Sequence, residues 1–259
     1  MIKLRPRIIP CLLLADGALV KTIKFRKPNY LGDPINAVKI FNEKEVDELC
    51  LMDICASKQG MKPDFELLTN IASEAFMPLS YGGGITCIEE IQTLFKIGFE
   101  KVIINTCFID NPNLLVEAVK LAGSQSIVVS IDVKETLLSK YVTYIAGGTK
   151  KTNRSPIEVA KMAEQLGAGE IIINSIDRDG MMQGYDIKLV KSIAETVNIP
   201  VVACGGAGKV SDLRQVIYEG NAHAASAGSL FVYYGKKKAV LINFPTEDEF
   251  IKEGVYKNE

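Results

Sequence analysis

The chain has 259 residues, of which 47% are hydrophobic and 24% charged, and its formal net charge is −1. The balanced charge argues against nucleic acid or an anionic membrane as a partner. No apolar run approaches the roughly 18 residues that span a bilayer, and the first residues contain no signal-peptide core, so we expect a cytoplasmic protein.

Short apolar runs alternate with amphipathic stretches along the whole chain. Eight of these runs have the nearly continuous apolar character of strands buried in a parallel sheet. They cover residues 8–14, 48–54, 78–81, 101–105, 126–132, 170–175, 200–204 and 223–227. Eight strands separated by helices in about 250 residues predict an α/β fold, a single (β/α)8 TIM barrel over residues 1–259.

Helix start signals lie between the predicted strands. A capping residue followed by proline, a capping box or a single capping aspartate predicts each start. These signals are at 33–34, 86–89, 111–112, 155–156, 186 and 246–249. Two further helices are expected over 62–75 and 210–218. The last barrel helix is expected to begin near Gly235, with the lysines at 236–238 in its solvated first turn.

Two connections are longer than the rest. Residues 16–32 follow the first strand and residues 133–154 follow the fifth, where 141–148 resemble a small hairpin. Loops of this length are usually lids or substrate-binding loops. Both follow the carboxyl ends of strands, where barrels place their active sites.

Two stretches of the chain repeat each other. Residues 77–84 match residues 199–206, and the paired prolines and glycines share one offset of 122 residues. A duplicated strand, glycine turn, helix and strand indicates internal two-fold symmetry, with half-barrels at about 1–122 and 123–259.

The repeated glycine turns are candidate anion sites. Each places backbone N–H groups at the start of a helix, an arrangement that suits a phosphate. Small residues end the next strand in each half, and the alternative is that the glycines serve tight turns only. The two candidate phosphate sites are formed by Gly83, Asn105 and Thr106, and by Gly206, Gly228 and Ser229.

Carboxylates stand at the ends of three predicted strands. Asp132 follows an apolar run and is the best candidate for a general acid or base. Asp179 and Gly180 are expected to begin the turn before the sixth helix, to cap that helix or to orient phosphate. For Asp53, anchoring a loop and taking part in chemistry are both open.

The opposite end of the barrel also carries charges. Four charged residues lie at strand starts and are able to pair across the floor, either as a stabilising ion network or as a gate. They are Arg7, Glu48, Lys101 and Glu170.

The six cysteines form no C-x-x-C pair and are interpreted as small buried hydrophobic residues. The single histidine, His223, begins a strand and is expected to be structural. These patterns predict neither a metal site nor a cofactor.

Many of these motifs together resemble the cyclase subunit of imidazole glycerol phosphate synthase (the HisF family). The matching stretches are 7–12, 32–34, 47–49, 81–85, 130–132, 167–170, 177–180 and 205–208. The resemblance implies a lyase of histidine biosynthesis that forms a heterodimer with a HisH-type glutaminase. It also implies that ammonia enters at the barrel floor and meets a substrate with two phosphates at the mouth.

The resemblance assigns roles position by position. The four floor residues correspond to the ammonia gate, and the candidate phosphate sites correspond to the family's own, with Asp179 and Gly180 added to the second. Lys21 corresponds to the mobile lysine of the first long loop. Asp132 corresponds to one of two catalytic aspartates.

Three mouth positions depart from the family pattern. Leu13 stands where the family has its second catalytic aspartate, and Asp16 matches a separate loop position. Asn174 and Cys204 replace the usual threonine and serine. Because acid–base catalysis contributes roughly 10²–10⁴-fold, an altered or lost cyclase activity is expected.

Residues 27–34 resemble more closely a paralogous group of this family, which is associated with ammonia supply for amidino sugars in bacterial surface glycans. Three interpretations remain: an altered cyclase, an ammonia-delivering barrel for sugar amidination, and a scaffold that activates a glutaminase. The related isomerase of the same pathway fits less well, since it needs a carboxylate on strand one and no floor gate.

Overall fold

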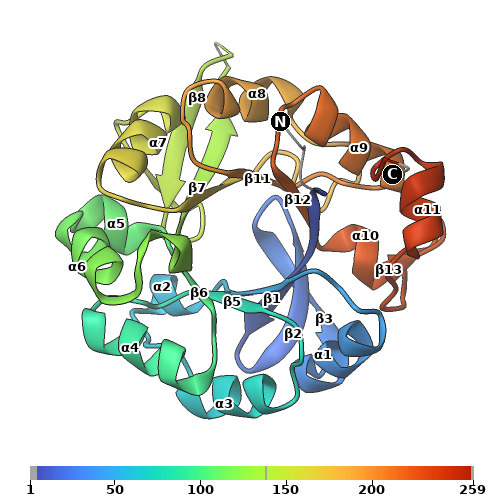
Figure 1. Ribbon diagram of the computed structural model, residues 1–259, viewed down its shortest axis with the longest axis horizontal. Helices are drawn as coiled ribbons and strands as arrows, with labels where there is room; N and C mark the ends of the chain where they lie inside the picture. The colour runs from blue at the N-terminus through green and yellow to red at the C-terminus, as the bar shows by residue number, and fades with distance from the viewer. Residues whose placement is uncertain (1–4, 138, 258–259) are drawn as a thin grey trace.

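The computed structural model describes residues 5–137 and 139–257. In these residues eight parallel strands close into a barrel, seen along its axis in Figure 1, because β7 and β10 pair and join the two ends of the sheet. The barrel strands are β1 (Arg7–Ala15), β4 (Leu49–Asp53), β5 (Leu79–Gly82), β6 (Lys101–Ile104), β7 (Ile127–Glu135), β10 (Glu170–Ser175), β11 (Val201–Cys204) and β12 (Ala224–Ala227). The predicted (β/α)8 barrel is confirmed.

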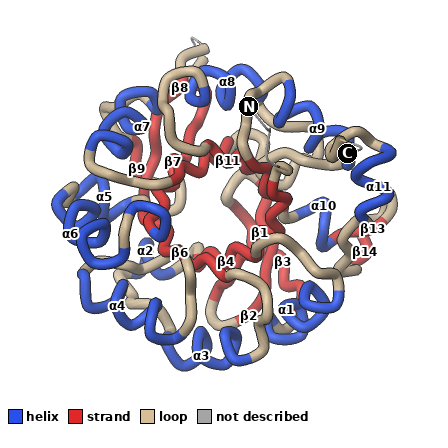
Figure 2. The backbone as a smooth tube through the Cα atoms, viewed as in Figure 1, coloured by secondary structure: helices blue, strands red, loops and turns tan. Residues whose placement is uncertain are grey.

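Helices form the outer ring around this sheet (Figure 2). The larger ones are α1 (Pro34–Glu43), α3 (Phe65–Ser73), α4 (Ile88–Ile97), α6 (Asn113–Ala122), α7 (Pro156–Gln165), α8 (Ile187–Ala194) and α9 (Val210–Tyr218). Shorter ones are α2 (Ala56–Gln59), α5 (Thr106–Asp110), the 3-10 helix η1 (Ser124–Ser126), α10 (Ser229–Val232) and α11 (Glu247–Lys252). Among the described residues, no helix has the length and apolar character needed to cross a membrane.

Side-chain caps explain where several helices begin. The Asp33 carboxylate accepts the Asn36 N–H at 3.0 Å, and Pro34 occupies the first turn of α1, as the sequence predicted. For α4 the predicted box was one residue off. Glu90, not Glu89, returns to the N–H groups of Thr86 and Cys87, because Cys87 is the N-cap and Glu90 is the third helical residue.

Both long connections contain antiparallel strands. The first holds β2 (Ala18–Ile23) and β3 (Arg26–Gly32), and β2 pairs with the end of β1. In the second, β8 (Tyr141–Ile145) pairs with the extended end of β7 and with β9 (Lys150–Lys151). The hairpin expected in the second loop is present, whereas the first was not foreseen as a hairpin.

The prediction of a helix near Gly235 is wrong. Gly235 and the three lysines after it form the turn between two short strands, β13 (Tyr233–Tyr234) and β14 (Ala239–Val240). Gly235 has φ +70°, a left-handed conformation that suits a turn and not a helix start. The helix after β12 is instead α10, which begins at Ser229.

Strand alternation separates two apolar layers. One layer fills the space between barrel and helices and includes Ile8, Leu12 and Leu14 of β1. The other includes Ile9 and Cys11 and lies inside the barrel with side chains from the other strands, namely Cys50, Ile103, Val128, Ile172, Val202 and Ala224. The barrel interior is therefore packed and largely apolar between its two ends.

Two buried tyrosines of this core provide a matched test. The Tyr81 hydroxyl has no hydrogen-bond partner among the described residues, whereas the Tyr185 hydroxyl donates to the Ser226 carbonyl at 2.9 Å. We expect Tyr81→Phe to leave the free energy of unfolding unchanged or to raise it by up to about 1 kcal/mol, since an unsatisfied polar group is removed. Tyr185→Phe should lower it by about 1–2 kcal/mol. Urea unfolding of both variants measures the difference, and equal destabilisation would contradict it.

Candidate functional site

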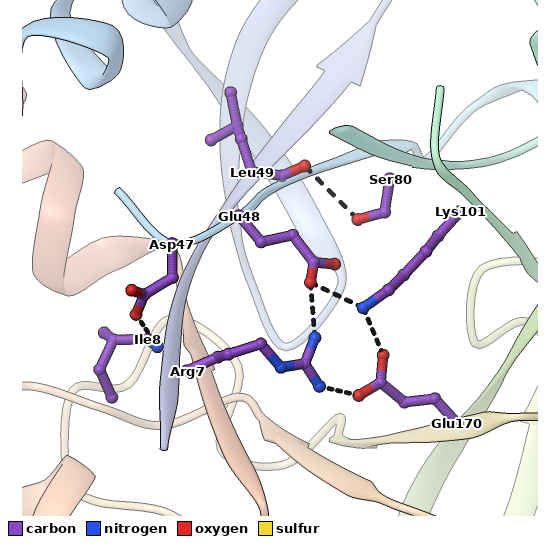
Figure 3. A network of polar contacts seen from close by, with 8 residues as sticks. All are labelled: Arg7, Ile8, Asp47, Glu48, Leu49, Ser80, Lys101 and Glu170. Carbon is purple, nitrogen blue, oxygen red and sulfur yellow. Dashed lines mark hydrogen bonds and ion pairs between the residues drawn. The ribbon is translucent and has the colours of Figure 1, made fainter. Parts of the chain in front are cut away.

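One end of the barrel is closed by four charged side chains (Figure 3). The Arg7 guanidinium pairs with Glu48 at 2.5 Å and with Glu170. The Lys101 ammonium pairs with the same two carboxylates at 2.7 Å and 2.9 Å. Cations and anions thus alternate around a ring. Burial lowers the pKa of Arg7, but the two glutamates outweigh burial and raise it above its ordinary value.

The carboxyl ends of the strands surround a cavity at the other end of the barrel. All of the mouth and phosphate-site residues predicted from the sequence line it together, although they come from different strands and loops. The candidates that line it are Leu13, Lys21, Asp53, Gly83, Asn105, Thr106, Asp132, Asn174, Asp179, Gly180, Cys204, Gly206, Gly228 and Ser229. This cavity, which we call the mouth, is the candidate active site.

Asp132 is a buried carboxylate in the mouth. The Asn105 amide donates to Asp132 Oδ2 at 3.3 Å and to the Ser130 carbonyl at 2.9 Å. Burial, with the charge of Asp179 as the second cause, raises the pKa of Asp132 to about 7. Both protonation states are therefore accessible at neutral pH, which suits a general acid or base.

Asp179 holds the first hairpin over the mouth. Its carboxylate accepts from the Lys21 ammonium at 2.7 Å, from the Thr22 hydroxyl at 2.8 Å and from the Phe25 N–H at 3.2 Å. Lys21 is only 7% exposed, so this ion pair largely removes it from solvent. Asp179 does not cap the sixth helix, because Asp186 accepts the Leu189 N–H and caps α8.

Asp53 anchors a loop, one of the two roles left open for it. Its Oδ1 accepts the N–H groups of Cys55 and Ala56 at 2.8 Å and 2.9 Å. These bonds fix the beginning of the short helix α2, which stands beside the mouth. The sequence analysis did not predict the helix α2.

Close packing of the backbone requires glycine at one position in each of the two glycine turns. Gly83 has φ +133°, and a Cβ at this position would lie 2.6 Å from the Asp53 carbonyl oxygen. Gly206 has φ +122°, and a Cβ there would overlap the Gly184 backbone. Tight turns therefore explain these glycines by themselves, and the two phosphate sites stay predictions.

The small polar residues near these turns differ in their bonding. The Thr106 hydroxyl oxygen accepts the Ala146 N–H at 3.0 Å, which ties α5 to the second long loop. The Ser229 hydroxyl is buried without a partner among the described residues, and it lines the mouth. An unpaired buried hydroxyl at this place is available to a ligand.

The positions that depart from the family pattern meet at the mouth. Leu13 lies beside Met52 in the β1–β4 register and adds an alkyl group. Asn174 lies opposite Asp132 in the β7–β10 register, and a hydrogen bond from it lowers the pKa of that carboxylate, although burial prevails. The Cys204 thiol contacts the Cys11 thiol, which, with burial, raises the pKa of Cys204 well above its ordinary value.

His223 lies away from the mouth, at the start of β12. Its Nδ1 accepts the Val201 N–H at 3.2 Å, and its own N–H donates to the Val201 carbonyl at 2.8 Å. The expected structural role agrees with these bonds. Lys58 was missed from the sequence although it lines the mouth, because nothing in the short segment between β4 and α3 signals the helix that carries it.

The raised pKa of Asp132 gives a pH-dependent stability. In the folded chain the Asp132 carboxyl keeps its proton up to about pH 7, whereas its ordinary pKa is 3.8. Between these two pH values the unfolded chain is ionised and the folded chain is not. The contribution of Asp132 to the free energy of unfolding therefore falls as the pH rises through this range. Asp132→Asn should raise the free energy of unfolding at pH 8 by on the order of 1–4 kcal/mol, and the gain should shrink toward pH 4.5. Denaturant unfolding across this range measures it, and a pH-independent difference would contradict the assignment.

The floor ring gives a second stability prediction. Lys101→Met leaves two neighbouring, buried carboxylates with only Arg7 between them. We expect a loss of roughly 2–4 kcal/mol at pH 7, since an uncompensated buried charge is costly. The double variant Lys101→Met/Glu170→Gln restores the charge balance and should recover part of that loss. Urea unfolding of both variants tests the pairing, and an unrecovered loss would argue against it.

Comparisons with known proteins cover nearly the whole chain. Residues 7–238 match the family model described as Histidine biosynthesis protein. A Leptospira interrogans protein, provisionally named imidazole glycerol phosphate synthase subunit HisF, is 49% identical over 254 residues, which are 98% of this chain and 99% of the relative.

Two further relatives show the same agreement. A Pseudomonas aeruginosa protein with a provisional name of the same kind is 49% identical over 241 residues, 93% of this chain and 96% of the relative. Imidazole glycerol phosphate synthase subunit HisF of Alkaliphilus metalliredigens is 40% identical over 227 residues, 88% of this chain and 90% of the relative. The chain therefore belongs to the HisF family of histidine biosynthesis proteins.

Proposed function

We propose that this chain is the ammonia-accepting barrel of a glutamine amidotransferase complex. It receives ammonia from a HisH-type glutaminase in a heterodimer and adds it to a phosphorylated acceptor at the mouth. The observation that carries the proposal is the closed floor ring of Arg7, Glu48, Lys101 and Glu170, which faces one end of an apolar barrel interior whose other end is the mouth.

The apolar interior supports passage of neutral ammonia. Ile9, Val128 and Ile172 lie there between the floor and the mouth. An ammonium ion would lose its hydration at a large cost in such surroundings, whereas uncharged NH3 loses little. Ammonia that crosses the barrel is then uncharged and nucleophilic where it meets the acceptor.

At the mouth, Asp132 is the group that moves protons. With a pKa of about 7 it gives a proton to the oxygen that leaves the acceptor and takes one from the nitrogen that has added. Leu13 supplies no second acid or base. The chain is therefore proposed to be a divergent paralogue in which ring closure is altered or lost while ammonia delivery is kept.

A second candidate function follows because all four charged residues of the floor ring are present, whereas Leu13 replaces a catalytic aspartate at the mouth. An ammonia-channelling subunit for amidino-sugar formation in bacterial surface glycans needs the floor but not the second aspartate. A non-catalytic scaffold that activates a glutaminase is the third candidate, and it requires neither Asp132 nor an acceptor site. All three need a glutaminase, so failure to co-purify with any glutaminase-like protein counts against them together.

A cyclase assay separates a protein that retains ring closure from the candidates that lack it. The purified chain is assayed with an ammonium salt and the family's ribulosyl substrate with two phosphates. We expect Leu13→Asp to exceed the unchanged protein by about 10²-fold or more, since an acid–base group is restored. Leu13→Asn, which has a similar shape and no acid, is the matched control and should stay at the low rate.

If the unchanged protein turned over at the rate of an ordinary cyclase, ring closure would not be lost. The role of the protein would then be in histidine biosynthesis. Equal low rates for all three proteins would show that the missing carboxylate is not the reason for inactivity.

A further inference from the structure

Two of the described lysines line the mouth, and their bonding differs. Lys21 is buried and paired with Asp179 at 2.7 Å. Lys58, on the short helix α2, also lines the mouth, and its side-chain ammonium forms no ion pair or hydrogen bond among the described residues. Nothing in the proposed ammonia transfer uses Lys58.

The structure holds α2 in a defined place beside the first glycine turn. The Asp53 carboxylate accepts the N–H groups of Cys55 and Ala56 at its beginning. The Ser57 hydroxyl oxygen accepts the Gly84 N–H at 3.2 Å and links the helix to that turn. Because Ser57 already engages this N–H, the first turn has one fewer donor for an anion than the glycine pattern suggests.

A second loop makes room for the lysine side chain. Gly147, in the connection between β8 and β9, also lines the mouth and has φ +58°. A Cβ at Gly147 would overlap Lys58 Cε, so the lysine stem crosses a place that only glycine leaves open. The charge of Lys58 also lowers the pKa of Asp132, against the larger effect of burial, which indicates that the two groups act within the same mouth.

We propose that Lys58 binds an anionic group of the acceptor, a phosphate or a carboxylate, at the first glycine turn. The ammonium supplies the positive charge that the turn lacks. In the other half of the barrel, the Ser229 hydroxyl has no partner among the described residues and is the group available to a second anion. The inference rests on the proposed function only in taking the mouth as the acceptor site. It makes Lys58 a residue that determines acceptor specificity.

Titration of the full-length protein with inorganic phosphate at constant ionic strength tests this directly. Calorimetry should find two sites in the unchanged protein. Lys58→Met should weaken one of them about 10-fold, the range for a hydrogen bond to a charged group, and Lys58→Arg should retain it. Ser229→Ala should weaken the other site. Lys236→Met removes an exposed lysine that does not line the mouth and should change neither site.

Gly147→Ala provides an independent test. The added methyl displaces the lysine side chain, so this variant should weaken the same site as Lys58→Met. The double variant should be no weaker than Lys58→Met alone, because both changes remove one interaction. Titration with acetate separates a carboxylate ligand from a phosphate ligand, since only the group that fits the site responds to Lys58.

Unchanged phosphate binding in Lys58→Met, or additive losses in the double variant, would overturn the proposal. These titrations involve no ammonia and no turnover. If phosphate binding depended on Lys58 but the protein transferred no ammonia, only the proposed function would be contradicted. If the protein transferred ammonia but phosphate binding did not depend on Lys58, only the proposed role of Lys58 would be contradicted.

Discussion

Closure of the parallel sheet is the constraint on which the rest of this structure depends. When β10 pairs with β7, every second side chain of each strand turns into one shared interior. Residues at strand starts then meet at the floor and residues at strand ends meet at the mouth, whatever their separation in the chain. Arg7 and Glu170 are brought together in this way, although 163 positions separate them.

The two ends of the barrel use charge differently. At the floor, two cations and two carboxylates neutralise each other in a closed ring. At the mouth, the carboxylates have separate partners: Asp179 holds the hairpin lysine and Asp53 accepts the backbone N–H groups at the start of α2. Among the described residues Asp132 is bonded by amide groups, and burial raises its pKa to about 7. The Lys58 ammonium also lines the mouth and has no ion-pair partner within the described part of the chain.

The sequence predicted features that depend on local patterns better than features that depend on long-range contacts. Apolar runs and caps predicted all eight barrel strands and most helix starts, because these depend on neighbours in the chain. The first hairpin and the β13–β14 turn were not predicted correctly. Glycine at 235 and lysines at 236–238 suit a helix start and a turn alike, and only pairing with a second strand distinguishes them.

The sequence by itself determined the alternation that makes a barrel, the charges at both ends and the absence of a carboxylate at Leu13. Each of these depends on residue identity and spacing. Only the tertiary structure decided how the charges are shared: Lys21 is paired with Asp179, Asp53 accepts the backbone N–H groups at the start of α2, and the Lys58 ammonium has no ion-pair partner among the described residues. Partner choice depends on which loops closure brings within hydrogen-bond distance, and no local pattern encodes that distance.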